Sequence, residues 1–261
     1  MSLSKKVAIV TGGGTGVGGA TSLALARQGY DVVVNYSRSQ TEAEKTAAEI
    51  AQLGVRSRVA LADVADDSAC RRMVSETVEA WGRIDVLVNC AGTTEFIPFD
   101  DLDRVTDEAW ERVYKVNVIG AFHCARAARE PMLKSGGGSI VNISSVAGTM
   151  ALGSSIPYCC SKAALDNLTI SLARTFAPGI RVNGVAPGFI TGRWLKGGLG
   201  ENYDRVKKAY DNSLPLGRVC DPEDVAACIL SLITGSTLVT GQTLLVDSGM
   251  SIAGYHLKFV E

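Results

Sequence analysis

Residues 7–18 read VAIVTGGGTGVG. The first four form an apolar, β-rich run, a glycine-rich stretch follows at once, and an Ala/Leu-rich helical pattern then continues to Gly29. Glycines between a strand and a helix let the backbone turn sharply and approach a phosphate, whose charge meets the free N–H groups of the helix. This order of elements predicts a nucleotide-binding turn at the start of an α/β fold, although the spacing is not a literal G-x-G-x-x-G.

Short apolar runs alternate with helical patterns along the rest of the chain. Further strands are expected over residues 31–36, 56–62, 84–89, 139–143, 180–185 and 243–246. Helices are expected over residues 39–53, 68–81, 107–134, 158–177, 202–211 and 222–232. Uninterrupted β-α alternation predicts a doubly wound, mostly parallel sheet with helices on both faces, in one domain spanning residues 1–261. Ligands of such sheets bind beyond the carboxyl ends of the strands.

The composition narrows the class of protein. A chain of 261 residues with a formal net charge of −1 and no dense Lys/Arg stretch favours neither nucleic acid nor an anionic membrane as a partner. The first apolar run is too short for a signal segment, and the uncharged stretch 135–161 is rich in Gly, Ser and Asn and contains Pro157, which excludes a membrane helix there. The seven cysteines include no C-x-x-C, so we expect neither disulfides nor a metal site, in a cytoplasmic protein.

The end of the second expected strand bears on the choice of cofactor. An Asp or Glu at this position binds a free ribose 2′-OH, but residues 34–38 read VNYSR, and Asp31 lies at the opposite end of the strand. The Ser37 hydroxyl and the Arg38 guanidinium could bind a 2′-phosphate, which a carboxylate would repel. The pattern favours NADP(H), with NAD(H) as the alternative in which Arg38 is a solvated surface charge.

Tyr158, Lys162 and Ser145 are the candidate catalytic residues. Tyr158 and Lys162 stand four residues apart in an expected helix and therefore share one face. A free tyrosine has a pKa of about 10, and a nearby ammonium, aided by a bound nicotinamide cation, is expected to lower it. Ser145 could hydrogen-bond a substrate oxygen as charge develops on it. Each residue alone has an ordinary structural explanation, but together, downstream of a nucleotide turn, they predict interconversion of a carbonyl and an alcohol.

The order and spacing of these pieces resemble the short-chain dehydrogenase/reductase family over about residues 6–251. The motifs that carry the resemblance are Thr11-Gly12-x3-Gly16-x-Gly18, Asn89-Cys90-Ala91-Gly92, Val116-Asn117-Val118, Ser144-Ser145-Val146-Ala147-Gly148, Tyr158-x3-Lys162 and Pro187-Gly188. The resemblance implies a Rossmann-type fold with a seven-stranded parallel sheet, assembled as a homotetramer or homodimer. It implies that Tyr158 is the general acid/base and that Lys162 binds the nicotinamide ribose and tunes Tyr158. It further implies that Ser145 positions the substrate carbonyl and that Asn117 holds a water in a proton relay.

The resemblance also implies the cofactor-binding positions, from the glycine turn to the loop after the sixth strand. They are Gly12, Gly14, Thr15, Gly16, Val17, Gly18, Tyr36, Ser37, Arg38, Asp63, Val64, Asn89, Ala91, Gly92, Tyr158, Lys162, Pro187, Gly188, Ile190 and Thr191. Asp63 and Val64 would lie near the adenine, and residues 187–191 around the nicotinamide carboxamide. Two positions depart from the family pattern: Cys90 replaces a common asparagine, and Thr15 stands where many NADP-dependent members carry Arg or Lys.

Residues 188–217 resemble the variable substrate lid of the family, and their glycines suggest mobility. The expected substrate contacts, for a small-molecule carbonyl or alcohol, are Ser145, Ala147, Met150, Ile156, Phe189, Trp194 and Leu195. Arg193 and Lys196 could bind an anionic substrate, although no charged cluster demands one.

The substrate itself is left open by the sequence. The general sequence pattern of the chain, including PLGR at 215–218, resembles that of 3-oxoacyl-acyl-carrier-protein reductases. Those reductases often dock the acidic carrier through basic residues before the fifth strand, where this chain has only Lys134 within 134–138. One alternative is a polyol, sugar or hydroxysteroid dehydrogenase. A catalytically idle NADP-binding sensor is less favoured, because the three candidate catalytic residues are all present.

Overall fold

The computed structural model describes residues 5–255, so residues 1–4 and 256–261 of the predicted domain lie outside the described residues. The described residues form a seven-stranded parallel sheet in the order β3-β2-β1-β4-β5-β6-β7. The strands are β1 (Val7–Thr11), β2 (Asp31–Tyr36), β3 (Ser57–Leu61), β4 (Val86–Asn89), β5 (Gly138–Ile143), β6 (Ile180–Pro187) and β7 (Thr243–Val246). The predicted Rossmann-type α/β fold is confirmed.

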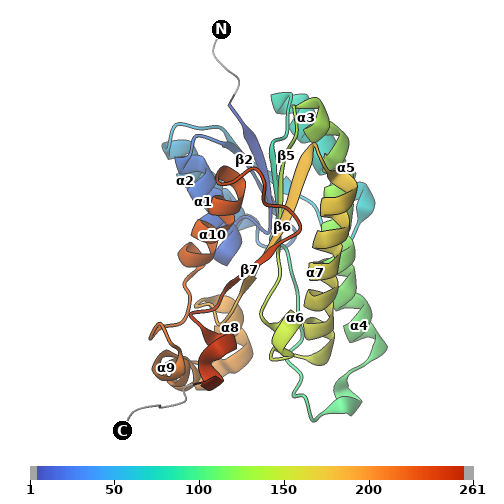
Figure 1. The fold of residues 1–261 in the computed structure, drawn as a ribbon. Coiled ribbons are helices and arrows are strands. Elements are labelled where there is room, and N and C mark those ends of the chain that lie inside the picture. Colours follow the sequence, from blue (N-terminus) through green and yellow to red (C-terminus); the bar gives the residue numbers. More distant parts are fainter. Residues whose placement is uncertain (1–4, 256–261) are drawn as a thin grey trace.

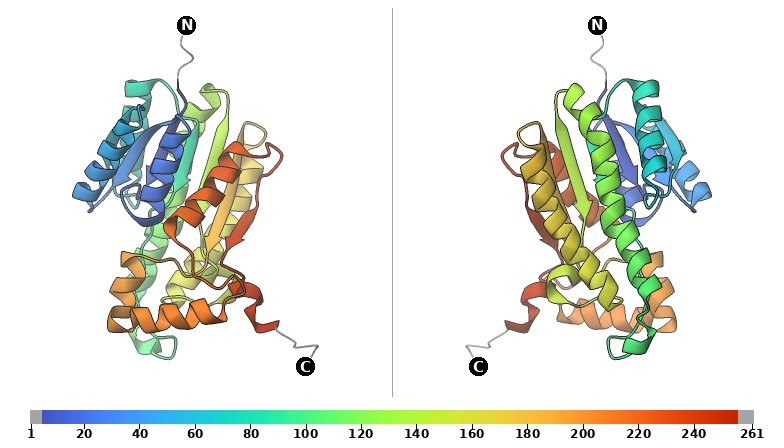
Figure 2. Two further views of the ribbon diagram at one scale, coloured as in Figure 1. Left: turned by 90° about the vertical axis from the view of Figure 1, so that its left-hand side faces the viewer. Right: turned by 90° about the vertical axis from the view of Figure 1, so that its right-hand side faces the viewer.

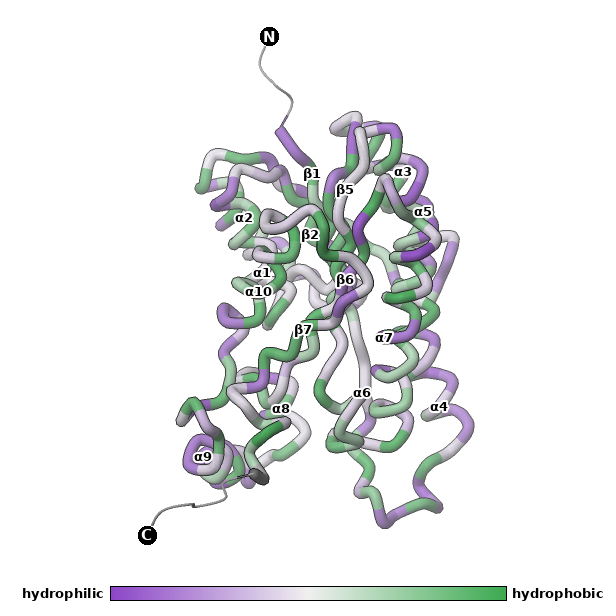
Figure 3. The backbone as a smooth tube through the Cα atoms, viewed as in Figure 1, coloured by the Kyte–Doolittle hydropathy of each residue, from purple (hydrophilic) through white to green (hydrophobic). Residues whose placement is uncertain are grey.

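Helices cover both faces of the sheet (Figures 1 and 2). One face carries α1 (Gly16–Arg27), α2 (Gln40–Gln52) and α10 (Pro222–Thr234), and the other carries α3 (Asp67–Trp81), α5 (Gly120–Lys134) and α7 (Ile156–Phe176). Both faces of the central strands are therefore buried, and successive side chains enter opposite cores: Ile9 packs with α3 and α5, whereas Val10 packs with α1 and α10. Figure 3 shows the resulting concentration of apolar residues along the central strands.

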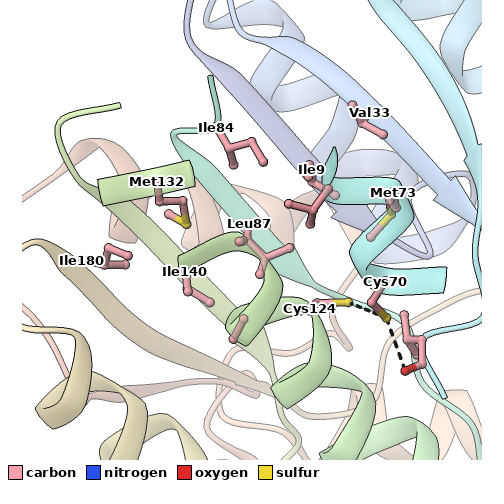
Figure 4. Close-up of a cluster of buried hydrophobic side chains, with 14 of the residues drawn as sticks. Ile9, Val33, Cys70, Met73, Ile84, Leu87, Cys124, Met132, Ile140 and Ile180 are labelled. Atoms are coloured by element: carbon pink, nitrogen blue, oxygen red, sulfur yellow. Dashed lines mark hydrogen bonds between the residues drawn. The ribbon is translucent and has the colours of Figure 1, made fainter. Parts of the chain in front are cut away.

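Figure 4 shows the core on the α3–α5 face, where Ile9, Leu87 and Ile140 are fully buried. Two thiols lie at the edge of this cluster: the Cys124 thiol donates to Cys70 Sγ at 3.5 Å. All seven cysteines fall within residues 5–255, and all are free.

The remaining elements gather toward the carboxyl ends of the strands, where Figure 1 shows α8 and α9 at the same end of the molecule as α6. They are η1 (Leu102–Arg104), α4 (Asp107–Tyr114), η2 (Lys115–Ile119), α6 (Ala147–Met150), α8 (Arg193–Leu199), η3 (Gly200–Asn202), α9 (Tyr203–Ser213) and η4 (Met250–Tyr255). Within the described residues, no helix has both the length and the apolar character needed to cross a bilayer.

Two elements differ from the sequence expectation. The single helix expected over 107–134 is divided into α4 and α5 by η2, a π-helical turn in which the Gly120 N–H bonds to the Lys115 carbonyl. An extra residue inside a helix leaves the apolar pattern on either side intact, so periodicity does not reveal such a turn. The lid, expected to contain one polar helix, also contains α8 ahead of α9.

Candidate active site

The glycine turn between β1 and α1 is tightly packed. Gly12 has a φ of 62°, which favours glycine, and its N–H donates to Asn35 Oδ1 at 3.2 Å. A Cβ on Gly18 would overlap the Gly12 carbonyl oxygen and lie 2.8 Å from the Gly12 carbonyl carbon. The first turn of α1 therefore presses directly against the preceding loop.

The same turn has room and free donors for an anion. Gly16 has a φ of 51°, and a Cβ built on it would meet no atom within 4 Å. Thr15 is the N-cap of α1, yet among the described residues its side chain makes no capping hydrogen bond and the first turn carries no acid. Exposed N–H groups at a helix N-terminus beside an open glycine fit a dinucleotide pyrophosphate, and Gly14 and Val17 border the same turn.

Asn35 organises this end of the sheet, a role that the sequence analysis missed. Its buried side chain accepts from Gly12 and donates to the carbonyls of Ala60 and Ala62 at 3.1 and 3.0 Å. One amide therefore ties together the ends of β1, β2 and β3. In the sequence, the sign of this role is a single amide side chain, that of Asn35, directly after three valines.

The segments after β2 and β3 lie near the turn. Tyr36 is partly buried, whereas Ser37 and Arg38 are exposed, and Arg38 makes no ion pair with any residue in 5–255. Asp31, at the far end of β2, is instead paired with Arg56 at 2.7 Å.

Of the two residues predicted near the adenine, Asp63 is exposed and accepts the Ala65 N–H at 2.9 Å. Val64 is buried in the α3–α5 core. Of these two side chains, only that of Asp63 is therefore accessible.

The loop after β4 borders the catalytic lysine. Thr11 Oγ1 accepts the N–H groups of Cys90 and Ala91, both at 3.0 Å, and buried Asn89 donates to Asn142 Oδ1 at 2.8 Å. A Cβ on Gly92 would lie 4.0 Å from both Lys162 Nζ and Trp194 Cη2. The loop thus connects the nucleotide turn to the start of α7.

Ser145, Tyr158 and Lys162 come together at the carboxyl ends of β5 and β6. Ser155 is the N-cap of α7, and the helix places Lys162 Nζ 5.5 Å from the centre of the Tyr158 ring. The Lys162 ammonium donates to the Ile143 carbonyl at 2.7 Å, and the Ser145 side chain is close enough to the Tyr158 hydroxyl to oppose the effect of burial on its pKa. The three predicted catalytic side chains therefore form one cluster.

Burial dominates the pKa values of this cluster. It raises the pKa of Tyr158 to about 12, against the opposing effect of the hydrogen bond with Ser145. It lowers the pKa of Lys162 to about 8, against the opposing effects of Cys90 and Asp166. The sequence predicts that Lys162, aided by a bound nicotinamide cation, lowers the pKa of Tyr158. In the protein alone the pKa is raised instead, because desolvation outweighs the effect of the nearby amine. Near neutral pH, Tyr158 is a phenol with a proton to donate.

The pH dependence of stability tests the burial of Lys162. Its pKa is about 8 in the folded protein and 10.5 without burial, so between these values the unfolded chain binds more protons. The free energy of unfolding must therefore rise as the pH increases through this window. Relative to Lys162→Met, wild-type stability is expected to rise by about 2 kcal/mol between pH 7.5 and pH 10, measured by urea denaturation. A difference that stays constant over this range would contradict a buried ammonium.

Asn117 lies in the π-helical turn and is buried. Its Oδ1 accepts the Thr93 N–H at 2.8 Å, and its Nδ2 donates to the Thr93 carbonyl and to Ser161 Oγ, both at 3.0 Å. Both amide hydrogens are used, so the side chain ties the loop after β4 to α7 and has no donor left for a water. The implied relay water would need a donor or acceptor on the main chain of this turn.

The lid brings one of its three predicted substrate residues to Tyr158. The Trp194 ring lies 6.4 Å from the Tyr158 ring, at 52°, and is 44% exposed. Phe189 is buried within the lid, 5.1 Å from the Tyr210 ring, and Leu195 packs against the same cluster. Phe189 and Leu195 thus hold the lid together.

The other predicted substrate residues flank Tyr158 in the chain. Ala147 and Met150 begin and end α6, where Ala147 is buried and Met150 is partly exposed. Ile156, also partly exposed, begins α7 two residues before Tyr158.

The loop after β6 is held by its main chain. The Pro187 carbonyl accepts from Ser145 Oγ at 3.4 Å, and Gly188 packs closely on Asp247. Ile190 forms a bridge with Cys220, and the Thr191 hydroxyl donates to Asp221. Pro187 therefore adjoins Ser145, whereas the Thr191 hydroxyl is engaged by the start of α10.

Known proteins that are similar to this chain agree with the chemistry of this site. A family model described as enoyl-(acyl carrier protein) reductase matches residues 12–251. The chain belongs to the short-chain dehydrogenase/reductase family. It is therefore an oxidoreductase of the type indicated by the Ser145, Tyr158 and Lys162 cluster.

Relatives of this dehydrogenase/reductase match almost end to end. The "Granaticin polyketide synthase putative ketoacyl reductase 2" of Streptomyces violaceoruber is 43% identical, over 93% of this chain and 95% of the relative. A 3-oxoacyl-[acyl-carrier-protein] reductase of Synechocystis sp. is 39% identical, over 95% and 98%. A solved 7α-hydroxysteroid dehydrogenase, in complex with NADH and 7-oxoglycochenodeoxycholic acid, has a TM-score of 0.86 at 30% identity, over 95% of this chain and 94% of that one.

Proposed function

We propose that this enzyme reduces a 3-oxoacyl thioester with NADPH, with Ser145, Tyr158 and Lys162 as the catalytic residues. The observation that carries the proposal is the partly buried phenol of Tyr158, which lies close to Ser145 and beside Lys162. The names of two relatives, a ketoacyl reductase and a 3-oxoacyl-[acyl-carrier-protein] reductase, support the substrate class.

The protein's contribution to the reaction is proton transfer and orientation. A nicotinamide dinucleotide, when bound, supplies the hydride. Tyr158 donates its phenolic proton to the substrate oxygen, and the Ser145 hydroxyl hydrogen-bonds that oxygen as negative charge develops. Lys162 places positive charge beside the phenol and so stabilises the tyrosinate that remains. The Trp194 ring shields the Tyr158 side from water and strengthens these interactions.

Turnover measurements test the substrate class. NADPH oxidation, followed by the absorbance of the reduced nicotinamide, is expected with acetoacetyl-CoA and to a much smaller extent with simple ketones and sugars. Turnover confined to other carbonyls would overturn the thioester assignment and leave the proton-transfer site in place. Docking of an acyl carrier protein is not proposed, because Lys134 is the only base in 134–138.

A hydroxysteroid dehydrogenase is the second candidate. The solved 7α-hydroxysteroid dehydrogenase supports it, as does the exposed apolar ring of Trp194 beside Tyr158, which offers a surface to a rigid apolar substrate. Oxidation of hydroxysteroids in preference to reduction of acetoacetyl-CoA would favour this reading.

The preference for NADP(H) is supported by the charges around β2. No acid stands at the end of β2 or in the two residues after it, Ser37 and Arg38, and Arg38 is exposed and makes no ion pair within residues 5–255. The acid of β2, Asp31, is at the other end of the strand and paired with Arg56.

Arg38→Ala tests this preference. The variant is expected to weaken NADPH binding by about tenfold or more and to leave NADH binding within about twofold, because only NADPH carries the 2′-phosphate. Dissociation constants from calorimetry measure both. Equal losses for the two cofactors would argue against a contact between Arg38 and the phosphate.

We also propose a homotetramer or homodimer in a cytoplasmic setting. Exposed apolar side chains support assembly: Phe122 on α5 and Ile170 on α7, and Leu244 and Leu245 on the edge strand β7. Light scattering is expected to give two or four times the chain mass of 27.4 kDa, and a monomeric mass would contradict assembly. The free thiols suit a reducing compartment, which cell fractionation would test.

A further inference from the structure

Arg193 makes contacts that proton transfer at Tyr158 does not explain. Its Nη2 donates to Thr15 Oγ1 at 3.1 Å and to Ser39 Oγ at 3.0 Å, and its Nη1 lies 2.8 Å from Glu42 Oε1. Thr15 is the N-cap of α1 and Ser39 is the N-cap of α2. The lid guanidinium therefore joins the two loops that follow β1 and β2.

These two loops border the predicted site of the 2′-phosphate. Ser37 and Arg38 immediately precede Ser39, and Thr15 lies at the N-terminus of α1. Arg193, which is 178 residues away from Thr15 in the sequence, brings a positive charge to that position. From the sequence, Arg193 is a candidate to bind an anionic substrate, whereas in the structure its guanidinium lies at the loops after β1 and β2.

A phosphate group can replace the Glu42 carboxylate as the partner of Arg193. Glu42 is its acidic partner among the described residues, and both side chains are about half exposed, at 58% for Arg193 and 47% for Glu42. An exposed ion pair of this kind contributes little, because water screens both charges. A ribose phosphate carries more negative charge and offers several oxygens to the planar guanidinium, so it can replace the carboxylate.

We propose that Arg193 is a lid-borne ligand of the 2′-phosphate of NADP(H), which releases Glu42 when it binds the cofactor. The proposal rests on the proposed NADP(H) preference. The next residue, Trp194, contacts Tyr158, so one peptide unit of the lid reaches both the phosphate and the catalytic tyrosine. The lid thereby contributes Arg193 to cofactor specificity and Trp194 to the surroundings of Tyr158.

Binding measurements test the proposal without turnover. Calorimetric dissociation constants would be compared for NADPH, NADH and the fragments 2′,5′-ADP and 5′-ADP, in the wild type, Arg193→Ala, Glu42→Gln and the double variant. Lys196→Ala is the matched control, because Lys196 is a lid cation whose ammonium lies over the Tyr203 ring, 5.4 Å from its centre.

The expected pattern is selective for the phosphate. Arg193→Ala should weaken NADPH and 2′,5′-ADP by about tenfold or more and change NADH and 5′-ADP by less than about twofold. Glu42→Gln should tighten NADPH, and only while Arg193 is present. Lys196→Ala should leave all four ligands unchanged.

Two results would overturn the inference. Unchanged NADPH affinity in Arg193→Ala would show that the guanidinium does not bind the cofactor. Equal weakening of NADPH and NADH would place it on the shared pyrophosphate or in lid packing. A wild type that prefers NADH would defeat the proposed cofactor preference by itself, and a loss confined to the 2′-phosphorylated ligands would support Arg193 even then.

Discussion

Tyr158→Phe is expected to lower the rate of carbonyl reduction by at least about a thousandfold while cofactor affinity stays near that of the wild type. The substitution removes only the hydroxyl, which lies close to Ser145 and, with its pKa raised to about 12, holds a proton near neutral pH. The ring that packs on Trp194 and lies beside Lys162 is kept. Single-turnover rates and calorimetric dissociation constants separate the two effects.

Tyr210→Phe is the matched control, because Tyr210 packs on Phe189 inside the lid, away from Ser145. It should retain most of the activity. Turnover close to that of the wild type in Tyr158→Phe would contradict the proposed proton transfer from Tyr158. A parallel loss of cofactor binding would instead indicate a structural role for the hydroxyl.

The sheet was predictable because its signals are local. The valines of β2 and the apolar runs of β1 and β4 are continuous, as strands buried on both faces require, and their bounds agree with the structure to within a few residues. The pairing of Tyr158 with Lys162 was also local, since four residues make about one helical turn.

The features that sequence reasoning missed depend on distant contacts. In the sequence, Asn35 indicated only that an acid is absent, because its partners Ala60 and Ala62 lie in and directly after the next strand, β3. The contacts of Arg193 span more than 150 residues of sequence, and nothing near Arg193 indicates them. Packing against α9, later in the same lid, decides that Phe189 is buried in the lid cluster.

The pKa values of the catalytic residues depend on how far each side chain is buried, and the sequence does not show the extent of burial. A Tyr–Lys pair suggested a lowered pKa for Tyr158, but both side chains are packed closely enough that desolvation raises the pKa of Tyr158 and lowers that of Lys162. In the protein alone this environment keeps Tyr158 protonated near neutral pH, which is the state required of a proton donor in reduction.

Gly18→Ala is expected to destabilise the protein by about 2–4 kcal/mol and to abolish measurable dinucleotide binding. A Cβ at this position overlaps the Gly12 carbonyl oxygen and lies 2.8 Å from the Gly12 carbonyl carbon and 3.1 Å from Gly13 Cα, all of them backbone atoms. Relief requires α1 to move away from the turn, and the N–H groups at its N-terminus would then no longer converge on the pyrophosphate site.

The neighbouring Gly19 supplies the control for that prediction, because the nearest atom to a Cβ there is the Gly14 carbonyl carbon at 3.4 Å, an ordinary contact. Gly19→Ala should keep both stability and binding, with a change of at most about 1 kcal/mol, since alanine is the better helix former. Thermal unfolding and calorimetric titration with NADPH measure the two quantities in both variants. Gly18→Ala is predicted to melt lower by about 5–10 °C. If the two variants behave alike, helix propensity rather than close packing of α1 on the turn governs this site, and the tight approach between Gly18 and Gly12 has no functional role.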